Sequence, residues 1–146
     1  MNFEECIKKG LIKKEPEAES WVKKEIKIAE RFLKSARRTM EIEEYNVVEL
    51  AAYLAAFHAA RALLYAKGFK ERSHICLGIA IKALYDDEML RDYMNTFDRI
   101  REMRHGIQYL GREPSKEECE LVLSFASELI KLAKRILGLT SSSSKE

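Results

Sequence analysis

The feature that most constrains this chain is residues 47–68, VVELAAYLAAFHAARALLYAKG, which are apolar or small on nearly every side. The stretch is long enough for about six helical turns. Two polar residues, His58 and Arg61, lie in its middle. A helix that is apolar all round is usually buried on most of its surface, and the alanines allow neighbouring helices to come close. We therefore predict a compact bundle around a central helix.

Helical periodicity and capping residues continue on both sides of this stretch. Apolar residues recur at three- and four-residue intervals from Trp21 to Met40, which is typical of an amphipathic helix. Ser73 and either Asp86 or Asp87 are suitable N-caps, and Gly68 and Gly111 are suitable residues to end a helix. Together with a capping box at Ser115 and Glu118, these signals predict helices over residues 16–42, 46–68, 73–84, 87–110 and 115–137.

This pattern predicts an all-α fold, an up-and-down antiparallel bundle of four main helices with additional short helices. Residues 1–15 form an N-terminal extension with a short helix ending near Gly10, residues 16–138 form the bundle, and residues 139–146 form a disordered tail. No strand pattern is recognisable in the sequence.

Composition excludes several classes of protein. Lys and Arg total 26 against 24 Asp and Glu, so the net charge of +2 gives no strong footprint for nucleic acid, although a local basic site is compatible with it. Cys6, Cys76 and Cys119 are scattered without a CxxC motif, which predicts reduced thiols in a cytoplasmic protein and no metal site. We also predict no cofactor, no membrane span and no signal peptide.

Polar residues enter the apolar face of the helix predicted at 87–110. On a helical wheel Arg104 falls between Tyr93 and Phe97, and the strip continues through Gln108, Arg101 and His105, with Tyr109 farther round. One interpretation is that Arg104 reaches solvent or pairs with an acid such as Glu49 or Glu44. The other is that Arg104 and His105 line a groove for a phosphate or nucleobase, because a guanidinium donates paired hydrogen bonds and an imidazole transfers protons.

The remaining histidines have structural interpretations. We expect His58 and Arg61 to be core polar groups that are satisfied by partners. His74 follows the candidate N-cap Ser73, and we expect it to complete a cap or a hydrogen bond between helices. Glycine-rich phosphate loops and HExxH pairs are missing from the sequence.

Three segments together resemble the prokaryotic HEPN domains: AYLAAFHAARALLYAKGF, then SH at the head of the next helix, then REMRHGIQY. The resemblance covers residues 20–137. It implies a helical bundle that is commonly a homodimer and is often encoded beside a minimal nucleotidyltransferase. Several such domains are toxins that cut RNA without a metal, using an arginine and a histidine four to six residues apart. In some, a nearby tyrosine receives AMP from the partner enzyme.

Two alignments of this resemblance to the chain remain open. Arg99 and His105 have the expected spacing, with five residues between them. Alternatively, Arg104 and Tyr109 match an R-x-x-x-[acid]-Tyr pattern in which Gln108 replaces the acid. The resemblance and the helical wheel together assign catalysis to Arg104, His105 and Arg101, and nucleotide or RNA binding to Arg101, Arg104, Gln108 and Tyr109.

The function we predict is that of a HEPN-like RNA-cleaving toxin or RNA-processing component of a nucleotidyltransferase/HEPN toxin–antitoxin pair. The alternative is a non-catalytic helical module that binds a nucleotide or a protein, and a third reading is a bundle that serves assembly only. The expected partners are a second copy of the chain, a minimal nucleotidyltransferase, and single-stranded RNA or a nucleotide.

Overall fold

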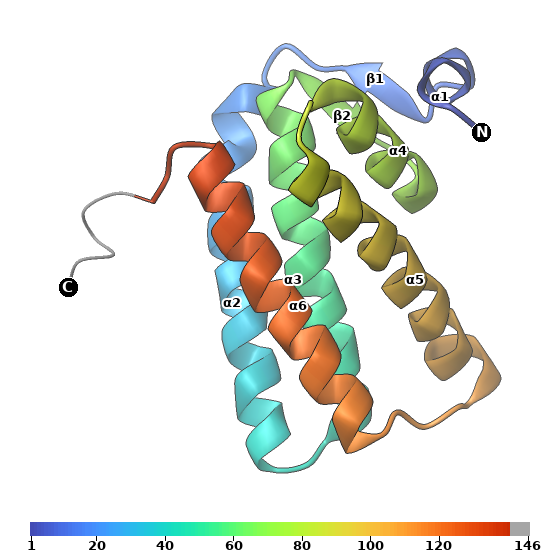
Figure 1. Cartoon of the computed structure of the whole chain (residues 1–146), viewed down its shortest axis with the longest axis vertical. Helices are drawn as coiled ribbons and strands as arrows, with labels where there is room; N and C mark the ends of the chain where they lie inside the picture. Colours follow the sequence, from blue (N-terminus) through green and yellow to red (C-terminus); the bar gives the residue numbers. More distant parts are fainter. Residues whose placement is uncertain (141–146) are drawn as a thin grey trace.

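A computed structural model describes residues 1–140, and Figure 1 shows the arrangement of its elements. The described residues are 76% helical, so the all-α prediction is confirmed. The last six residues of the predicted tail lie outside the described residues. The elements are α1 (Phe3–Lys8), β1 (Ile12–Lys14), the 3-10 helix η1 (Ala18–Trp21), α2 (Val22–Glu41), α3 (Tyr45–Ala66), β2 (Phe69–Glu71), α4 (His74–Leu84), α5 (Glu88–Leu110) and α6 (Lys116–Ile136).

Helix α3 is the centre of the bundle. It packs against α2 and α6, and it also contacts α4 and α5 (Figure 1). Its alanines at 52, 55, 56, 59, 60 and 62 are completely buried, which lets the neighbouring backbones approach. Among the described residues, α3 alone has the length and composition to cross a membrane, but 72% of its most apolar window is buried by other helices. This burial is what a core helix requires.

The predicted helix ends are confirmed at several positions. The Ser73 side chain accepts a hydrogen bond from the Cys76 backbone N–H, and Asp87, rather than Asp86, caps α5. Ser115 and Glu118 form the capping box of α6. Gly111 ends α5 with a φ of 73°, in the left-handed region that a residue without Cβ adopts readily.

Two short strands correct the expectation that the chain has no strand. β1 and β2 pair antiparallel, with Ile12 opposite Glu71 and Lys14 opposite Phe69. Each strand is only three residues long, too short for the alternation by which strands are recognised in a sequence. The pairing holds the N-terminal extension against the end of α3 and places α1 beside α4 (Figure 1).

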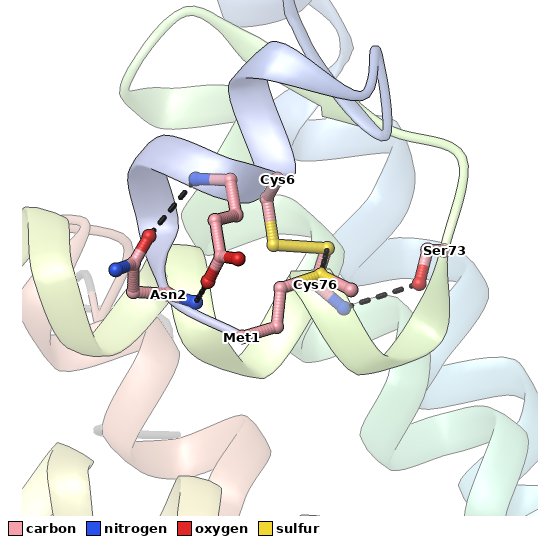
Figure 2. The surroundings of a disulfide bond; sticks show 6 residues. Met1, Asn2, Cys6, Ser73 and Cys76 are labelled. Carbon is pink, nitrogen blue, oxygen red and sulfur yellow. Dashed lines mark hydrogen bonds between the residues drawn. A yellow bond between two sulfur atoms is a disulfide. The ribbon is translucent and has the colours of Figure 1, made fainter.

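A disulfide between Cys6 and Cys76 overturns the prediction that all three cysteines are reduced (Figure 2). It joins α1 to the first turn of α4 across 70 residues of sequence. Spacing in the sequence gave no sign of it, because the two cysteines meet only after β1 pairs with β2. Cys119 is the remaining cysteine and has a free thiol, which is buried and donates a hydrogen bond to the carbonyl of Tyr45.

Candidate functional site

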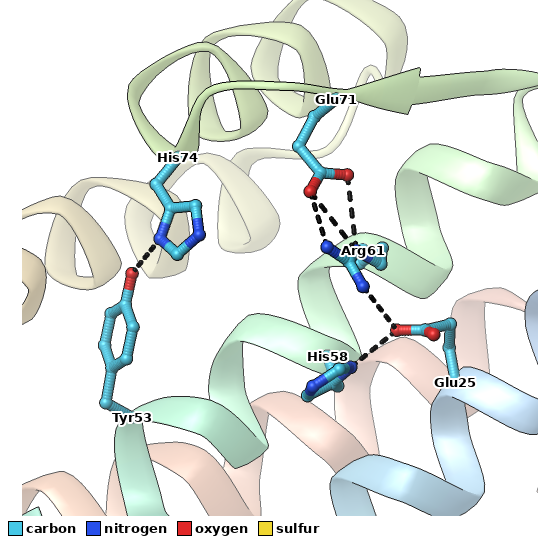
Figure 3. A network of polar contacts seen from close by, with 6 residues as sticks. All are labelled: Glu25, Tyr53, His58, Arg61, Glu71 and His74. Carbon is cyan, nitrogen blue, oxygen red and sulfur yellow. Dashed lines mark hydrogen bonds and ion pairs between the residues drawn. The ribbon is translucent and has the colours of Figure 1, made fainter. Parts of the chain in front are cut away.

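The polar residues in the middle of α3 form a closed ion-pair cluster (Figure 3). His58 Nδ1 lies 2.7 Å from Glu25 Oε1, and Arg61 Nη2 lies 2.7 Å from Glu71 Oε2. Arg61 Nη1 is also 3.9 Å from the Glu25 carboxylate. All four side chains are mostly buried. The expectation that His58 and Arg61 are satisfied core groups is confirmed, and we call this set of four residues the Arg61 cluster.

A second polar region is open to solvent. A cavity of about 580 Å³ lies between the first turn of α4 and the C-terminal half of α5. We call it the α4–α5 pocket, and its lining residues are Ser73, His74, Ile75, Arg101, Glu102, Arg104, His105 and Tyr109. Four of the residues selected from the sequence therefore share one cavity. Gln108 is on the same helix, but the orientation of its side chain lies outside the described part.

The alternative arginine, Arg99, is on a different face of α5. It is exposed, donates a hydrogen bond to Thr96 Oγ1, and lines a separate cavity between α5 and α6. The fold therefore brings Arg101 and Arg104, but not Arg99, to the pocket that contains His105. Arg99 and His105 are six positions apart, which corresponds to about 600° of helical rotation. This is about 120° short of two full turns, so the two side chains lie on different sides of α5.

Arg104 is held at the inner wall of the pocket by an aromatic ring. Its guanidinium carbon lies 4.4 Å from the centroid of the fully buried Tyr53 ring, which stacks on Phe97. This cation–π contact lets a guanidinium lie close to the core. Burial raises the pKa of Tyr53 to about 12, although Arg104 opposes the shift. Neither carboxylate oxygen of Glu49 accepts a hydrogen bond within the described residues, so Glu49 is not a hydrogen-bonded acid partner of Arg104.

Arg101 is tethered at the edge of the pocket by Asp98, one turn earlier on α5. The two side chains are 3.5 Å apart, and Lys82 of α4 lies 4.0 Å from the other Asp98 oxygen. Burial raises the pKa of Asp98, while Arg101 and Lys82 oppose that shift. Gly78 makes the arrangement feasible, because a Cβ at that position would lie 3.1 Å from Asp98 Oδ1. This glycine lets α4 approach α5 closely enough to enclose the pocket.

His105 and Tyr109 occupy the exposed side of the pocket, one turn apart. Their ring centroids are 4.8 Å apart, and Tyr109 is 62% exposed. His74 forms part of the facing wall, with its Nδ1 2.7 Å from the Tyr53 hydroxyl (Figure 3). The expected hydrogen bond between helices is thus confirmed for His74. Its position in the pocket was missed, although the Ser73–His74 pair at a predicted helix start was the available signal.

The pocket contains the kinds of side chain that bind anions and transfer protons in other proteins. It presents two guanidinium groups and two imidazoles, with Glu102 as the one acid among its lining residues. Two arginines so close together suit an oxygen-rich anion such as phosphate. Within residues 1–140 no cluster of three or more His, Cys, Asp or Glu side chains that could hold a metal ion is found.

The helical bundle and the pocket define an all-helical domain with a cationic site between two helices. A family model of the HEPN domain matches residues 22–136, so the chain belongs to the HEPN domain family. The match runs from the start of α2 to the end of α6 and leaves α1, β1 and η1 outside. No curated protein matches the chain.

Proposed function

We propose that the α4–α5 pocket binds a phosphate of single-stranded RNA and that the protein is a metal-independent endoribonuclease. The observation that carries this proposal is the convergence of Arg101, Arg104 and His105 in one solvent-accessible cavity. Arg61, by comparison, lies within the mostly buried Arg61 cluster. Arg104 lines an open pocket beside a second guanidinium and an exposed imidazole.

The chemistry requires only groups that the pocket contains. His105 would accept the proton of a ribose 2′-hydroxyl while O2′ attacks the adjacent phosphorus. The P–O5′ bond then breaks, and O5′ takes a proton from the imidazolium, which leaves a 2′,3′-cyclic phosphate and a 5′-hydroxyl. Arg101 and Arg104 would stabilise the additional negative charge on the phosphorane oxygens.

The test is cleavage of a fluorescently labelled single-stranded RNA by purified protein in the presence of EDTA. The wild type should release products ending in a cyclic phosphate, and the same sequence as DNA should stay intact because it lacks the 2′-hydroxyl. His105→Ala should slow cleavage by about 100-fold or more, the usual size of a general acid–base contribution. Arg104→Ala should have a comparable effect. Arg38→Ala, which removes an exposed cation of α2, is the matched control.

Three outcomes separate the functional alternatives. Intact RNA over a range of pH and salt would end the nuclease proposal. Binding of RNA or of a mononucleotide without cleavage would favour the non-catalytic nucleotide-binding module. Normal cleavage by both pocket variants would show that the activity lies elsewhere on the molecule.

We also propose that the protein is a homodimer joined through the groove between α5 and α6. This groove, of about 560 Å³, is lined by apolar side chains that include Leu121, which is 72% exposed. Asp92 and Arg99 lie at its α5 side with Thr96 between them. Two α5 helices packed antiparallel would bring each Asp92 near the Arg99 of the other copy. Light scattering should give a dimer for the wild type and a monomer for Leu121→Glu, whereas a monomeric wild type would refute the proposal.

A minimal nucleotidyltransferase is the partner that the family resemblance suggests, in a toxin–antitoxin arrangement. The exposed Tyr109 side chain beside His105 supports this proposal, because an adenylyl group there would add bulk and negative charge at the mouth of the pocket. A reading frame for such an enzyme next to this gene is the first check. Incubation with that enzyme and ATP should add AMP to the wild type but not to Tyr109→Phe.

We propose that the protein is cytoplasmic, because its proposed substrate is RNA. The Cys6–Cys76 disulfide argues against it, since structural disulfides are rare in the cytosol. Alkylation of thiols at the moment of cell lysis, followed by mass spectrometry, shows whether Cys6 and Cys76 are oxidised or reduced in the cell. One alkylated cysteine per chain would mean that the disulfide exists in the cell, and three would mean that it does not.

A further inference from the structure

His74 has neighbours in both polar regions of the molecule, and Figure 3 shows it with Tyr53 and the residues of the Arg61 cluster. As the first residue of α4 it lines the α4–α5 pocket. Its ring stacks on Phe57 with centroids 4.2 Å apart, and its Nδ1 is hydrogen-bonded to the Tyr53 hydroxyl. The imidazole is therefore fixed in orientation on one side, while the cavity adjoins it on the other.

Both rings that hold His74 also carry a guanidinium. The guanidinium carbon of Arg61 lies 4.5 Å from the centroid of the Phe57 ring, and the guanidinium carbon of Arg104 lies 4.4 Å from the centroid of the Tyr53 ring. The charged groups that act on His74 are accordingly Glu71 of β2, Arg61 of α3, and Arg101 and Arg104 of α5. Burial lowers the pKa of His74, Glu71 opposes the shift, and the three arginines add to it. In the unliganded protein the imidazole is neutral near pH 7.

We propose that His74 is a third ligand-binding side chain of the pocket, beside Arg101 and Arg104, and that it takes up a proton from solvent when a phosphodiester binds. This inference rests on the proposed function, because it assigns a further residue to the same site. A bound phosphodiester would offset the positive charge of the two arginines, which is part of what keeps His74 neutral. The Tyr53 hydroxyl can accept as well as donate, so the protonated imidazole would keep its hydrogen bond.

The consequence is a pH dependence of affinity with a defined sign. Ligand binding that takes up a proton strengthens as the pH falls towards the pKa of His74 in the unliganded protein. A phosphodiester keeps its single negative charge throughout the neutral range, so a change in affinity there reports the protein. His105 is the other histidine that lines the pocket. It has to be replaced so that the pH dependence that His74 causes can be measured by itself.

The experiment measures binding of an uncleavable, fluorescently labelled single-stranded oligonucleotide, made of 2′-O-methyl nucleotides without terminal phosphates. Affinity is followed by anisotropy between about pH 5.5 and 8 at constant ionic strength, because phosphate contacts depend on salt. His105→Asn is compared with the double variant His105→Asn/His74→Asn. We expect the affinity of the single variant to rise by about 10-fold towards low pH, the size of one pKa unit of linkage. The double variant should change by less than about 2-fold.

An NMR titration of the His74 ring in the wild type makes the test independent of whether the variant folds. Addition of the oligonucleotide should move the titration midpoint of His74 to higher pH. An unchanged midpoint, or equal pH dependence in the single and double variants, would overturn the role of His74 while leaving the proposed function intact. No binding of the oligonucleotide at any pH would overturn both.

Discussion

The Arg61 cluster and the α4–α5 pocket each contain an arginine packed on an aromatic ring, but the groups around the two arginines differ. In each, a guanidinium lies about 4.5 Å from the centroid of an aromatic ring of α3, Phe57 in the first and Tyr53 in the second. Around Arg61, carboxylates from α2 and β2 approach within 4 Å, and the side chains of the cluster are mostly buried. Around Arg104, the lining of the cavity contains a second arginine, two histidines and one acid.

The difference separates a cation that lies among carboxylates of the chain from a cation that lines an open cavity. Charges near a core are costly unless they are compensated. The Arg61 cluster carries its compensation within the chain, from elements that are distant in sequence. The pocket collects cationic groups in a place that solvent can reach, and the proposed binding of an anion depends on that arrangement.

The largest expected effect on stability concerns the wall of the pocket. The Cys6–Cys76 disulfide fastens the first turn of α4, which carries His74. Cross-linking across 70 residues should contribute about 4 kcal/mol by the loop-entropy relation. Cys6→Ser is expected to lower the free energy of unfolding by about that amount in urea titrations. A loss below about 1 kcal/mol would show that the β1–β2 pairing alone holds α1 in place.

Arg61→Met should be the next most harmful change. It would leave the buried carboxylate of Glu71 without its cation, which costs about 3 kcal/mol in comparable buried pairs, and Glu25 would keep only His58. Urea unfolding at pH 7 measures the change directly. If this variant were as stable as the wild type, the Arg61 cluster would not be structural, and the contrast with the pocket would fail.

Glu49, which lies on α3, should make the stability of the protein depend on pH. Its carboxylate is completely buried, and burial together with the charge of Glu118 raises its pKa to about 7, with Arg112 opposing. Because the folded-state pKa exceeds the unfolded value of 4.5, its stabilising contribution is complete below that pH and is lost as the pH rises through 7. We expect Glu49→Gln to be more stable than the wild type at pH 8, by about 2 kcal/mol, and the difference to shrink by pH 5. An equal difference at both pH values would contradict this assignment.

Arg104→Met should have the smallest effect on stability. The variant keeps the apolar part of the side chain over Tyr53 and loses a cation–π contact worth about 1 kcal/mol. The same urea titration, run beside Arg61→Met, gives the comparison. A loss as large as that of Arg61→Met would indicate that Arg104 is a structural residue as well.

The sequence predicted the parts of this molecule that depend on local signals. The caps at Ser73, Asp87 and Ser115 were readable because an N-cap is satisfied by backbone a few residues away. The convergence of Arg101, Arg104 and His105 followed from their angles on one helix. Features that depend on distant pairing were not readable: the Cys6–Cys76 disulfide, the β1–β2 pair, and the identity of Tyr53 as the partner of His74. None of these has a periodic or short-range signature.

The most direct test of the account is oligonucleotide binding by Arg104→Met and Arg61→Met, two matched removals of a guanidinium from an aromatic ring. The uncleavable single-stranded oligonucleotide is used at low temperature, with circular dichroism to verify that both variants are folded. The account predicts that Arg104→Met weakens binding by about 10-fold or more, as expected when a charge-assisted contact to phosphate is lost, while Arg61→Met binds within about 2-fold of the wild type. Equal affinities for Arg104→Met and the wild type, or a larger loss for Arg61→Met, would contradict it.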